Sequence, residues 1–237
     1  MSEFDISLID GKYIMDLGSS PYAEMLPALA TDDDPRIAVS LPELLQPRVL
    51  DQLLLRIYGS ELMPAHKPVL VSQWSKYYLM HWLPVMLVSQ LGHGWDLPLL
   101  LREVGLVLDE RGLPVAIRFF EAGEPGDAQA SLEPWIASNL RPFVDILSRY
   151  GDMPAAVLWG NAGDYLEQGL RDIERLGMVD PGPGQAMLST RKLADGRPNP
   201  LYAPVRYLGD GRRERRSCCL AYQVENIGHC QSCPLAH

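Results

Sequence analysis

The sequence of 237 residues predicts an α+β fold, with a mainly helical body, a β-hairpin or small sheet, and a small C-terminal segment that contains the cysteines. Three observations predict it. Apolar residues recur at helical spacing in the segments 40–91 and 132–176, the period changes to two within 104–120, and all four cysteines lie in the last 20 residues. Hydrophobic residues make up 47% and charged residues 22%, which is typical of a globular protein that buries a core.

The first helices are predicted from a capping pattern and from hydrophobic spacing. Ser40-Leu-Pro-Glu43 has the form of a capping box, and Leu45, Val49, Leu53 and Ile57 follow it at helical spacing. A second helix is expected over about 67–91. Because it is apolar on most faces, we expect it to be central, with a kink at Pro84.

A β-hairpin is predicted next, because apolar residues alternate on both sides of a turn. The alternating residues are Val104, Leu106 and Leu108, and then Val115, Ile117 and Phe119. Asp109 to Gly112 forms the predicted turn, and 121–127 reads as a loop rich in glycine and proline.

Two further helices are expected over about 132–150 and 155–176, with Asp152 as a cap for the second. From 180 to 211 the runs PGPG, DGRPNP and GDGRR predict an irregular connector. We therefore divide the chain into a mainly helical α+β body, 1–211, and a C-terminal segment, 212–237.

Charge and targeting signals suggest a cytoplasmic protein. The net charge of −9 argues against nucleic-acid binding. The same negative charge slightly favours neutral or cationic ligands over highly anionic ones. The N-terminal run MSEFDISLID lacks the pattern of a secretory signal, and the apolar stretch Tyr77 to Leu91 is short for a membrane span. In the cytoplasm thiols stay reduced, which favours metal ligation over disulfides.

The cysteines form a candidate metal site. Cys218, Cys219, Cys230 and Cys233 give the spacing C-C-x10-C-x2-C, and thiolates suit zinc, copper(I) or iron–sulfur clusters. The adjacent pair must lie in a bend for both side chains to reach one site. A [2Fe–2S] cluster is larger than one ion and accommodates such a pair more easily, so the spacing favours iron–sulfur. Zinc, or a role that is not ligation, stays open.

The run from Arg215 to Leu235 resembles the C-terminal signature of FhuF-type ferric siderophore reductases, a family with a [2Fe–2S] cluster on this cysteine motif. Ser72-x-Trp74 and Trp159-Gly-Asn161 also resemble family features, and these four named residues are candidate substrate contacts. The resemblance implies an oxidoreductase that releases iron by one-electron reduction of a ferric siderophore, which the body, 1–211, would bind. It also implies peripheral association with the inner membrane, without a transmembrane segment.

Four arginines precede the cysteines, and we weigh two interpretations of them. By default they form a solvated loop, but Arg215 and Arg216 could instead tune the cluster potential or contact an anionic electron donor, with Arg216 preferred. His229 is not expected to be a ligand, because four cysteines complete the set.

The sequence contains no GxGxxG, P-loop or G-x-S-x-G motif. Electrons are therefore expected from an external donor, a ferredoxin or an NAD(P)H-dependent reductase. Two alternatives remain at this point: a binding protein with a structural four-cysteine zinc site, and a ferredoxin-like carrier that serves another acceptor.

Overall fold

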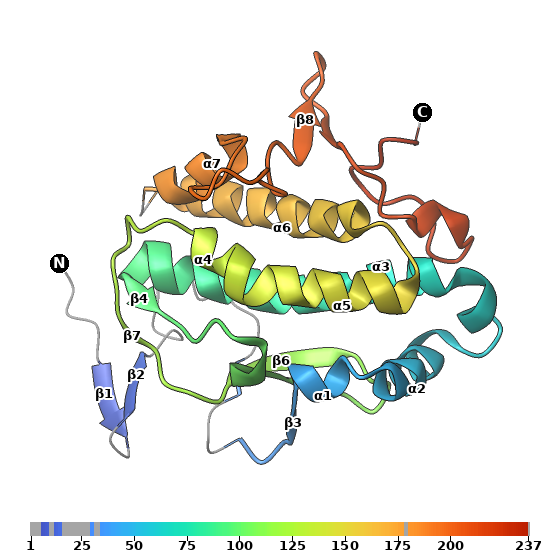
Figure 1. Ribbon diagram of the computed structural model, residues 1–237, viewed down its shortest axis with the longest axis horizontal. Helices are drawn as coiled ribbons and strands as arrows, with labels where there is room; N and C mark the ends of the chain where they lie inside the picture. The colour runs from blue at the N-terminus through green and yellow to red at the C-terminus, as the bar shows by residue number, and fades with distance from the viewer. Residues whose placement is uncertain (1–5, 10–11, 16–28, 31–33, 178–179, 237) are drawn as a thin grey trace.

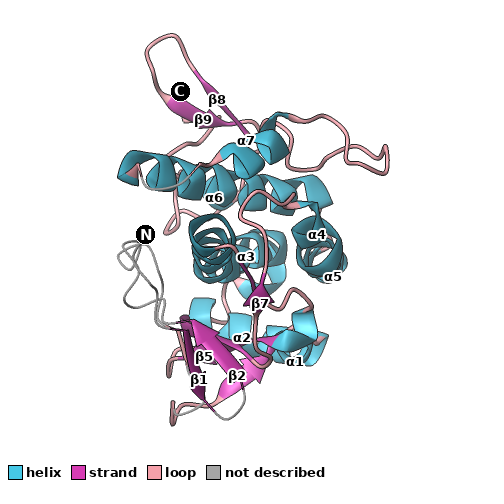
Figure 2. Ribbon diagram, turned by 90° about the vertical axis from the view of Figure 1, so that its left-hand side faces the viewer, coloured by secondary structure: helices cyan, strands magenta, loops and turns pink. Residues whose placement is uncertain are grey.

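The computed structural model describes residues 6–9, 12–15, 29–30, 34–177 and 180–236. It confirms the α+β class. The elements form three layers: small sheets with two helices, then α3 with α5, then α6 with α7 (Figure 1). A β8–β9 hairpin projects beyond α6 (Figure 2). None of the helices in the described part of the chain has the length and hydropathy of a membrane span.

Helix α3 (Met63–Leu87) is central, as predicted, and continues into a π-helical turn at Val88–Gly92. It packs against α2 (Pro47–Tyr58), α5 (Arg141–Gly151), α6 (Ala155–Leu176) and strand β6. The Tyr78 ring lies 6.0 Å from Trp82 and 4.5 Å from Phe143, between centroids. Aromatic packing on several sides explains why α3 is apolar around most of its circumference.

Two details of the predicted early helices are wrong. The capping box does not start one long helix, because α1 (Leu41–Leu44) ends before Pro47, which begins α2 and leaves Gln46 extended. Ser40 makes no side-chain cap bond. The kink in α3 is not at Pro84, where the backbone stays helical. It is at His66 (φ −122°, ψ 18°), two residues before Pro68, which has no backbone N–H to donate to the preceding turn.

The predicted hairpin is confirmed and belongs to a sheet of three antiparallel strands in the order β3-β5-β6. The strands are β3 (Ala38–Ser40), β5 (Val104–Leu108) and β6 (Pro114–Phe119). Asp109 Oδ1 accepts the backbone N–H of Arg111 and Leu113 at 2.9 and 2.8 Å, which stabilises the turn.

Two further small pairings complete the sheet layer. Strand β1 (Ile6–Ile9) pairs with β2 (Lys12–Met15), and β4 (Trp95–Asp96) pairs with β7 (Glu124–Pro125). The predicted loop at 121–127 therefore contains a short strand. A 3₁₀ turn, Leu101–Glu103, precedes β5.

The later helices match the prediction, except for their caps and the connector. Helix α4 (Glu133–Trp135) runs through a π-helical turn (Ile136–Leu140) into α5. Asp152 is left-handed (φ 47°) and ends α5, so it is not the cap of α6, whose N-cap is Pro154. The predicted connector contains α7 (Gly182–Ser189) and β8 (Val205–Tyr207).

Strand β8 pairs with β9 (Arg213–Arg215), and a 3₁₀ turn, Ala221–Gln223, follows. This hairpin crosses the expected boundary between residues 211 and 212. The division into two domains stays a prediction.

Candidate metal centre

The cysteine segment, residues 216–236, lies beside α6 and contacts α3 through its 3₁₀ turn. Leu220 is left-handed (φ 65°) and turns the chain directly after Cys219. This turn supplies a bend next to the cysteine pair, and it also lets the Leu220 N–H donate to Cys218 Sγ at 3.3 Å. A left-handed leucine is strained, so tertiary packing must hold this turn.

All four cysteines are free thiols, with Cys219 and Cys233 buried and Cys218 and Cys230 partly exposed. Cys230 donates a hydrogen bond to Cys219, and this bond is the main reason that the pKa of Cys219 is lowered and that of Cys230 is raised. Burial raises the pKa of Cys218. The sulfurs of Cys219 and Cys230 therefore lie within hydrogen-bonding distance of each other.

Backbone N–H groups surround the sulfurs. Besides Leu220, Ala221 donates to Cys219, and Leu235 donates to Cys233 Sγ at 3.4 Å. His229 Nδ1 lies 3.3 Å from Cys233 Sγ, and its ring stacks on Tyr222 at 6.0 Å. Hydrogen bonds to sulfur stabilise thiolates and are a means of tuning iron–sulfur clusters.

The donor set fits an iron–sulfur cluster in its chemistry: four soft thiols from one segment, three of them with backbone N–H donors. Among the described residues, no three His, Cys, Asp or Glu side chains converge on the position of a single metal ion.

Arg213 fixes strand β9 to α6. Its Nε lies 2.6 Å from Glu167 Oε2 and its Nη1 lies 2.7 Å from Asp164 Oδ1. The same Nη1 also donates to Ser232 Oγ at 2.9 Å, within the cysteine segment. One guanidinium group therefore joins α6, β9 and the stretch between Cys230 and Cys233.

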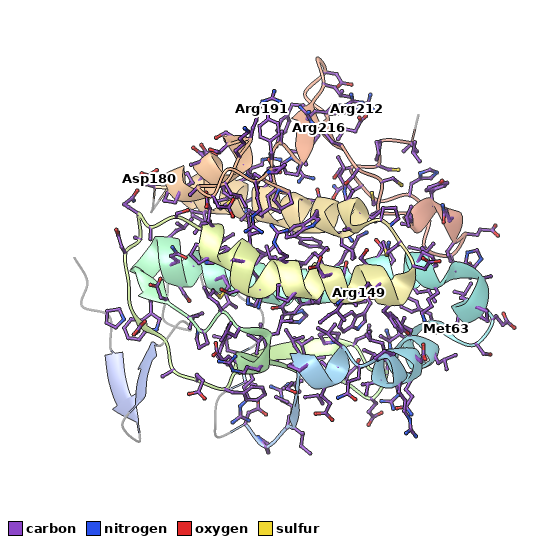
Figure 3. The ribbon with its side chains drawn as sticks, viewed as in Figure 1. Met63, Arg149, Asp180, Arg191, Arg212 and Arg216 are labelled. Atoms are coloured by element: carbon purple, nitrogen blue, oxygen red, sulfur yellow. The ribbon has the colours of Figure 1, made fainter. Side chains whose placement is uncertain are left out.

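Arg215, rather than the preferred Arg216, lies within the site. Its side chain is 1% exposed, and its Nη2 donates to Asn161 Oδ1 at 2.6 Å. Its positive charge helps to lower the pKa of Cys219, after the hydrogen bond from Cys230 and the charge of Lys76. Arg216, which is labelled in Figure 3, is exposed, whereas the burial of Arg215 does not fit a solvated loop. A role of either arginine in tuning the cluster or contacting a donor stays a prediction.

A buried polar chain connects both long helices to the cysteines. Ser72 Oγ and Gln73 Nε2 on α3 donate to the Cys219 carbonyl at 2.8 and 3.0 Å. Asn161 Nδ2 on α6 donates to Ser72 O and to Ser75 Oγ, both at 3.0 Å. Ser72 and Asn161, expected as substrate contacts, are fully buried, with Ser72 bonded to the Cys219 carbonyl and Asn161 bonded to Ser72. Substrate contact by these two residues stays a prediction.

The two tryptophans considered as substrate contacts belong to the core. Trp74 is fully buried with its ring 6.3 Å from that of Phe143, and Trp159 is 8% exposed with the Arg141 guanidinium 5.8 Å from its ring. Substrate contact by these residues stays a prediction, without support from their exposure.

Glycines on α6 allow the C-terminal segment to approach closely. A Cβ at Gly160 would lie 1.6 Å from Ser217 Oγ, and one at Gly163 would lie 2.5 Å from Pro204 Cβ. The glycine in the run Trp159-Gly-Asn161 was visible in the sequence, but only the fold shows that it faces Ser217. Sequence reasoning also missed Asp164 and Glu167, whose spacing of three places both on one face of α6.

A cavity of about 780 Å³ opens beside Cys233. It lies between the C-terminal half of α6, the β8–β9 hairpin and the stretch 231–236, and Cys233 is part of its lining. Its volume is in the range of sites that bind small molecules.

Comparison with known proteins agrees with this geometry. Residues 72–215 match the family described as "Ferric iron reductase FhuF-like transporter", and residues 215–235, which contain all four cysteines, match the FhuF 2Fe-2S C-terminal domain. The Escherichia coli (strain K12) protein named "Ferric siderophore reductase" is 26% identical over 214 residues, covering 85% of this chain and 80% of its own length.

Two structures of the aerobactin synthetase IucA from a hypervirulent pathotype of Klebsiella pneumoniae, one bound to ATP, share the fold. Their TM-scores are 0.55 and 0.54 at 15% identity, and the match covers 73% of this chain but only 38% and 39% of theirs. At this identity the likeness concerns the fold alone. The family matches extend over most of the chain, and the second includes every cysteine. The chain therefore belongs to the FhuF-like ferric iron reductase family and is an oxidoreductase that carries a [2Fe–2S] cluster.

Proposed function

We propose that this protein releases iron from ferric siderophores in the cytoplasm by one-electron reduction of Fe(III) to Fe(II). We also propose that Cys218, Cys219, Cys230 and Cys233 hold the [2Fe–2S] cluster. One observation carries the proposal: the four thiols lie in one segment that is hydrogen-bonded to α3 and linked to α6 through Arg213, and one of them, Cys233, lines a cavity of about 780 Å³. The presence of free thiols supports a reducing compartment.

The chemistry of iron explains why one electron is sufficient. Siderophores bind Fe(III) through hard oxygen ligands, and Fe(II), being softer and less charged, is held less well by the same ligands. A bound [2Fe–2S] cluster supplies one electron at a time. The siderophore itself then needs no covalent cleavage.

The residues of this chain have distinct roles in the proposal. The N–H groups of Leu220, Ala221 and Leu235 donate to the sulfurs and stabilise their negative charge. Arg215 places a buried positive charge next to them. The cavity holds the ferric complex against Cys233, which lines it. Electron transfer requires that the electron donor and the ferric complex lie close together.

Electrons enter from a separate protein in this proposal, a ferredoxin or an NAD(P)H-dependent reductase, because the sequence has no recognisable nucleotide-binding motif. Cys218 and Cys230 are partly exposed, which gives such a donor a route to the site.

Anaerobic reduction of a ferric siderophore tests the function. The purified protein is first assayed for iron, acid-labile sulfide and zinc, then reduced with dithionite, freed of excess reductant, and mixed with a ferric trihydroxamate and a coloured Fe(II) chelator. We expect about two irons and two sulfides per chain, and about one Fe(II) per reduced cluster. A protein with one zinc and no sulfide would exclude the proposal. Equal rates with simple ferric chelates would instead indicate a general electron carrier.

A further inference from the structure

Lys76 on α3 is connected to the cysteine segment through a single amide side chain. Its Nζ donates to Gln73 Oε1 at 2.8 Å, and Gln73 Nε2 donates to the Cys219 carbonyl at 3.0 Å. Among the described residues, no carboxylate pairs with Lys76. A positive charge without a counter-ion is therefore tied to the backbone of a proposed cluster ligand.

The fold of α3 fixes the direction of this side chain. Gln73 and Lys76 are three residues apart and lie on the same face of the helix, while Trp74 and Tyr78 point into the core. The 3₁₀ turn Ala221–Gln223, which follows the cysteine pair, packs against the same helix. Lys76 is only partly exposed, so water screens its charge incompletely.

The arginines that reach the same region are neutralised by α6. Arg213 Nη1 lies 2.7 Å from Asp164 Oδ1 and its Nε lies 2.6 Å from Glu167 Oε2, while Arg215 Nη1 lies 3.5 Å from Asp164 Oδ2. Two positive and two negative side chains therefore compensate one another. Of Lys76, Arg213 and Arg215, Lys76 is the one whose charge the protein does not balance.

From this arrangement we propose that Lys76 supplies the positive charge that stabilises the reduced [2Fe–2S] cluster and so raises its reduction potential. Gln73 is the positioning residue that holds the ammonium group beside the cysteines. The inference rests on the proposed function, because it takes the four cysteines as the cluster ligands.

The physical reason is electrostatic. A cluster held by four thiolates is negatively charged, and reduction adds one further negative charge, so a nearby cation stabilises the reduced state more than the oxidised one. The free thiols respond in the same sense. After the hydrogen bond from Cys230, which is the main cause, the charge of Lys76 lowers the pKa of Cys219 more than the charge of Arg215 does.

A series of charges at position 76 tests the inference. Lys76→Arg keeps the charge, Lys76→Met removes it at similar side-chain length, and Lys76→Glu reverses it. The reduction potential of the cluster-loaded protein is measured by anaerobic potentiometric titration followed by visible absorbance. We expect the Arg variant to match the natural protein. The Met variant should hold the electron about tenfold less tightly, which corresponds to a potential about 60 mV lower, and the Glu variant should lie lower again.

Two controls locate the effect. Arg111→Gln removes an exposed arginine from the turn between β5 and β6, in the sheet layer, and is expected to shift the potential much less. In a Gln73→Leu background, Lys76→Met is expected to cause a smaller shift than in the natural protein, because the ammonium group is no longer held in place. Equal iron and sulfide content in all variants establishes that the cluster is intact. Lys76→Gln is a second neutral variant, used if the Met side chain prevents cluster loading.

Each outcome bears on one proposal or the other. An unchanged potential in the neutral variant, or equal shifts in the Arg and Met variants, would overturn the inference. Potentials that follow the charge at position 76, in a protein whose reduced cluster is not re-oxidised by a ferric trihydroxamate, would leave the role of Lys76 standing and remove the proposed function. An unchanged potential combined with slower reduction by an acidic ferredoxin would make Lys76 a docking residue for the donor, and the inference would be wrong.

Discussion

Arg215 donates a hydrogen bond from Nη2 to Asn161 Oδ1 at 2.6 Å, and both side chains are buried. Arg215 precedes Cys218 by three residues, while Asn161 Nδ2 bonds to Ser72, which in turn bonds to the Cys219 carbonyl. A chain of buried hydrogen bonds therefore links β9, α6, α3 and the cysteine segment. A buried guanidinium is costly to desolvate, so this fold retains it only with partners, which here include Asp164 at 3.5 Å.

Replacing Arg215 with Gln is expected to lower the reduction potential of the cluster. Loss of a positive charge near the thiolates favours the less negative, oxidised state, and about one order of magnitude in the equilibrium corresponds to roughly 60 mV for one electron. Potentiometric titration followed by visible absorbance measures the shift. Arg216→Gln is the matched control, because that side chain is exposed and a much smaller shift is expected. Equal shifts in the two variants would show that burial of Arg215 is irrelevant to the potential.

Gly160→Ala is expected to reduce cluster loading while leaving the helices intact. The new Cβ would lie 1.6 Å from Ser217 Oγ and 2.9 Å from Ser217 Cβ, so the residue before Cys218 must move. Alanine itself favours a helix, and overpacking of this kind costs about 1–3 kcal/mol. Gly209→Ala serves as control, because a Cβ there would meet nothing within 4 Å. Iron and sulfide analysis with far-UV circular dichroism measures both effects; full loading of the Gly160 variant would contradict the close packing.

Cys233→Ser is expected to abolish the visible absorption of the cluster and the release of Fe(II), because serine does not replace a soft thiolate ligand. The helical body should remain, since the buried apolar residues of its main core lie outside the cysteine segment. Anaerobic spectra check the loss of cluster absorption, iron analysis checks the loss of Fe(II) release, and circular dichroism checks that the helices remain. Normal iron release by this variant would remove Cys233 from the ligand set.

The stability of the protein is expected to fall as the pH drops below about 6.5. Burial lowers the pKa of His81 from its ordinary value of 6.5, and the same cause acts on His93. Between the folded and unfolded pKa values the unfolded chain binds more protons, so stability is complete above the unfolded pKa and is lost as the pH falls through the folded one.

His81→Asn tests this dependence, because an amide N–H can replace the His81 Nδ1 group, which lies 2.7 Å from the Tyr77 carbonyl oxygen, without titrating. Urea denaturation at pH 7.5 and pH 5.5 should show a smaller difference in the variant than in the natural protein. An unchanged difference would assign the pH dependence to other groups.

Local patterns predicted the regular elements well. Helix α6 (Ala155–Leu176) and the hairpin of β5 and β6 were predicted because hydrophobic period and turn residues are properties of neighbouring positions. The elements that the sequence did not predict are short segments that are stabilised by contacts with residues distant in the chain. Helix α7 lies in a run rich in glycine and proline, and β3 has three residues that are stabilised by pairing with β5.

The donor chemistry could be read from the amino-acid sequence alone, because it depends on four thiols at a fixed spacing next to arginines, in a chain without a recognisable nucleotide-binding motif. The burial of Arg215, the bond from Ser72 to the Cys219 carbonyl and the cavity beside Cys233 are visible only in the folded chain. Ser72 and Cys219 are 147 positions apart, and no local pattern relates residues at such separation. Their contact arises because α3 and α6 must bury their apolar faces against each other, which brings the C-terminal segment onto both helices.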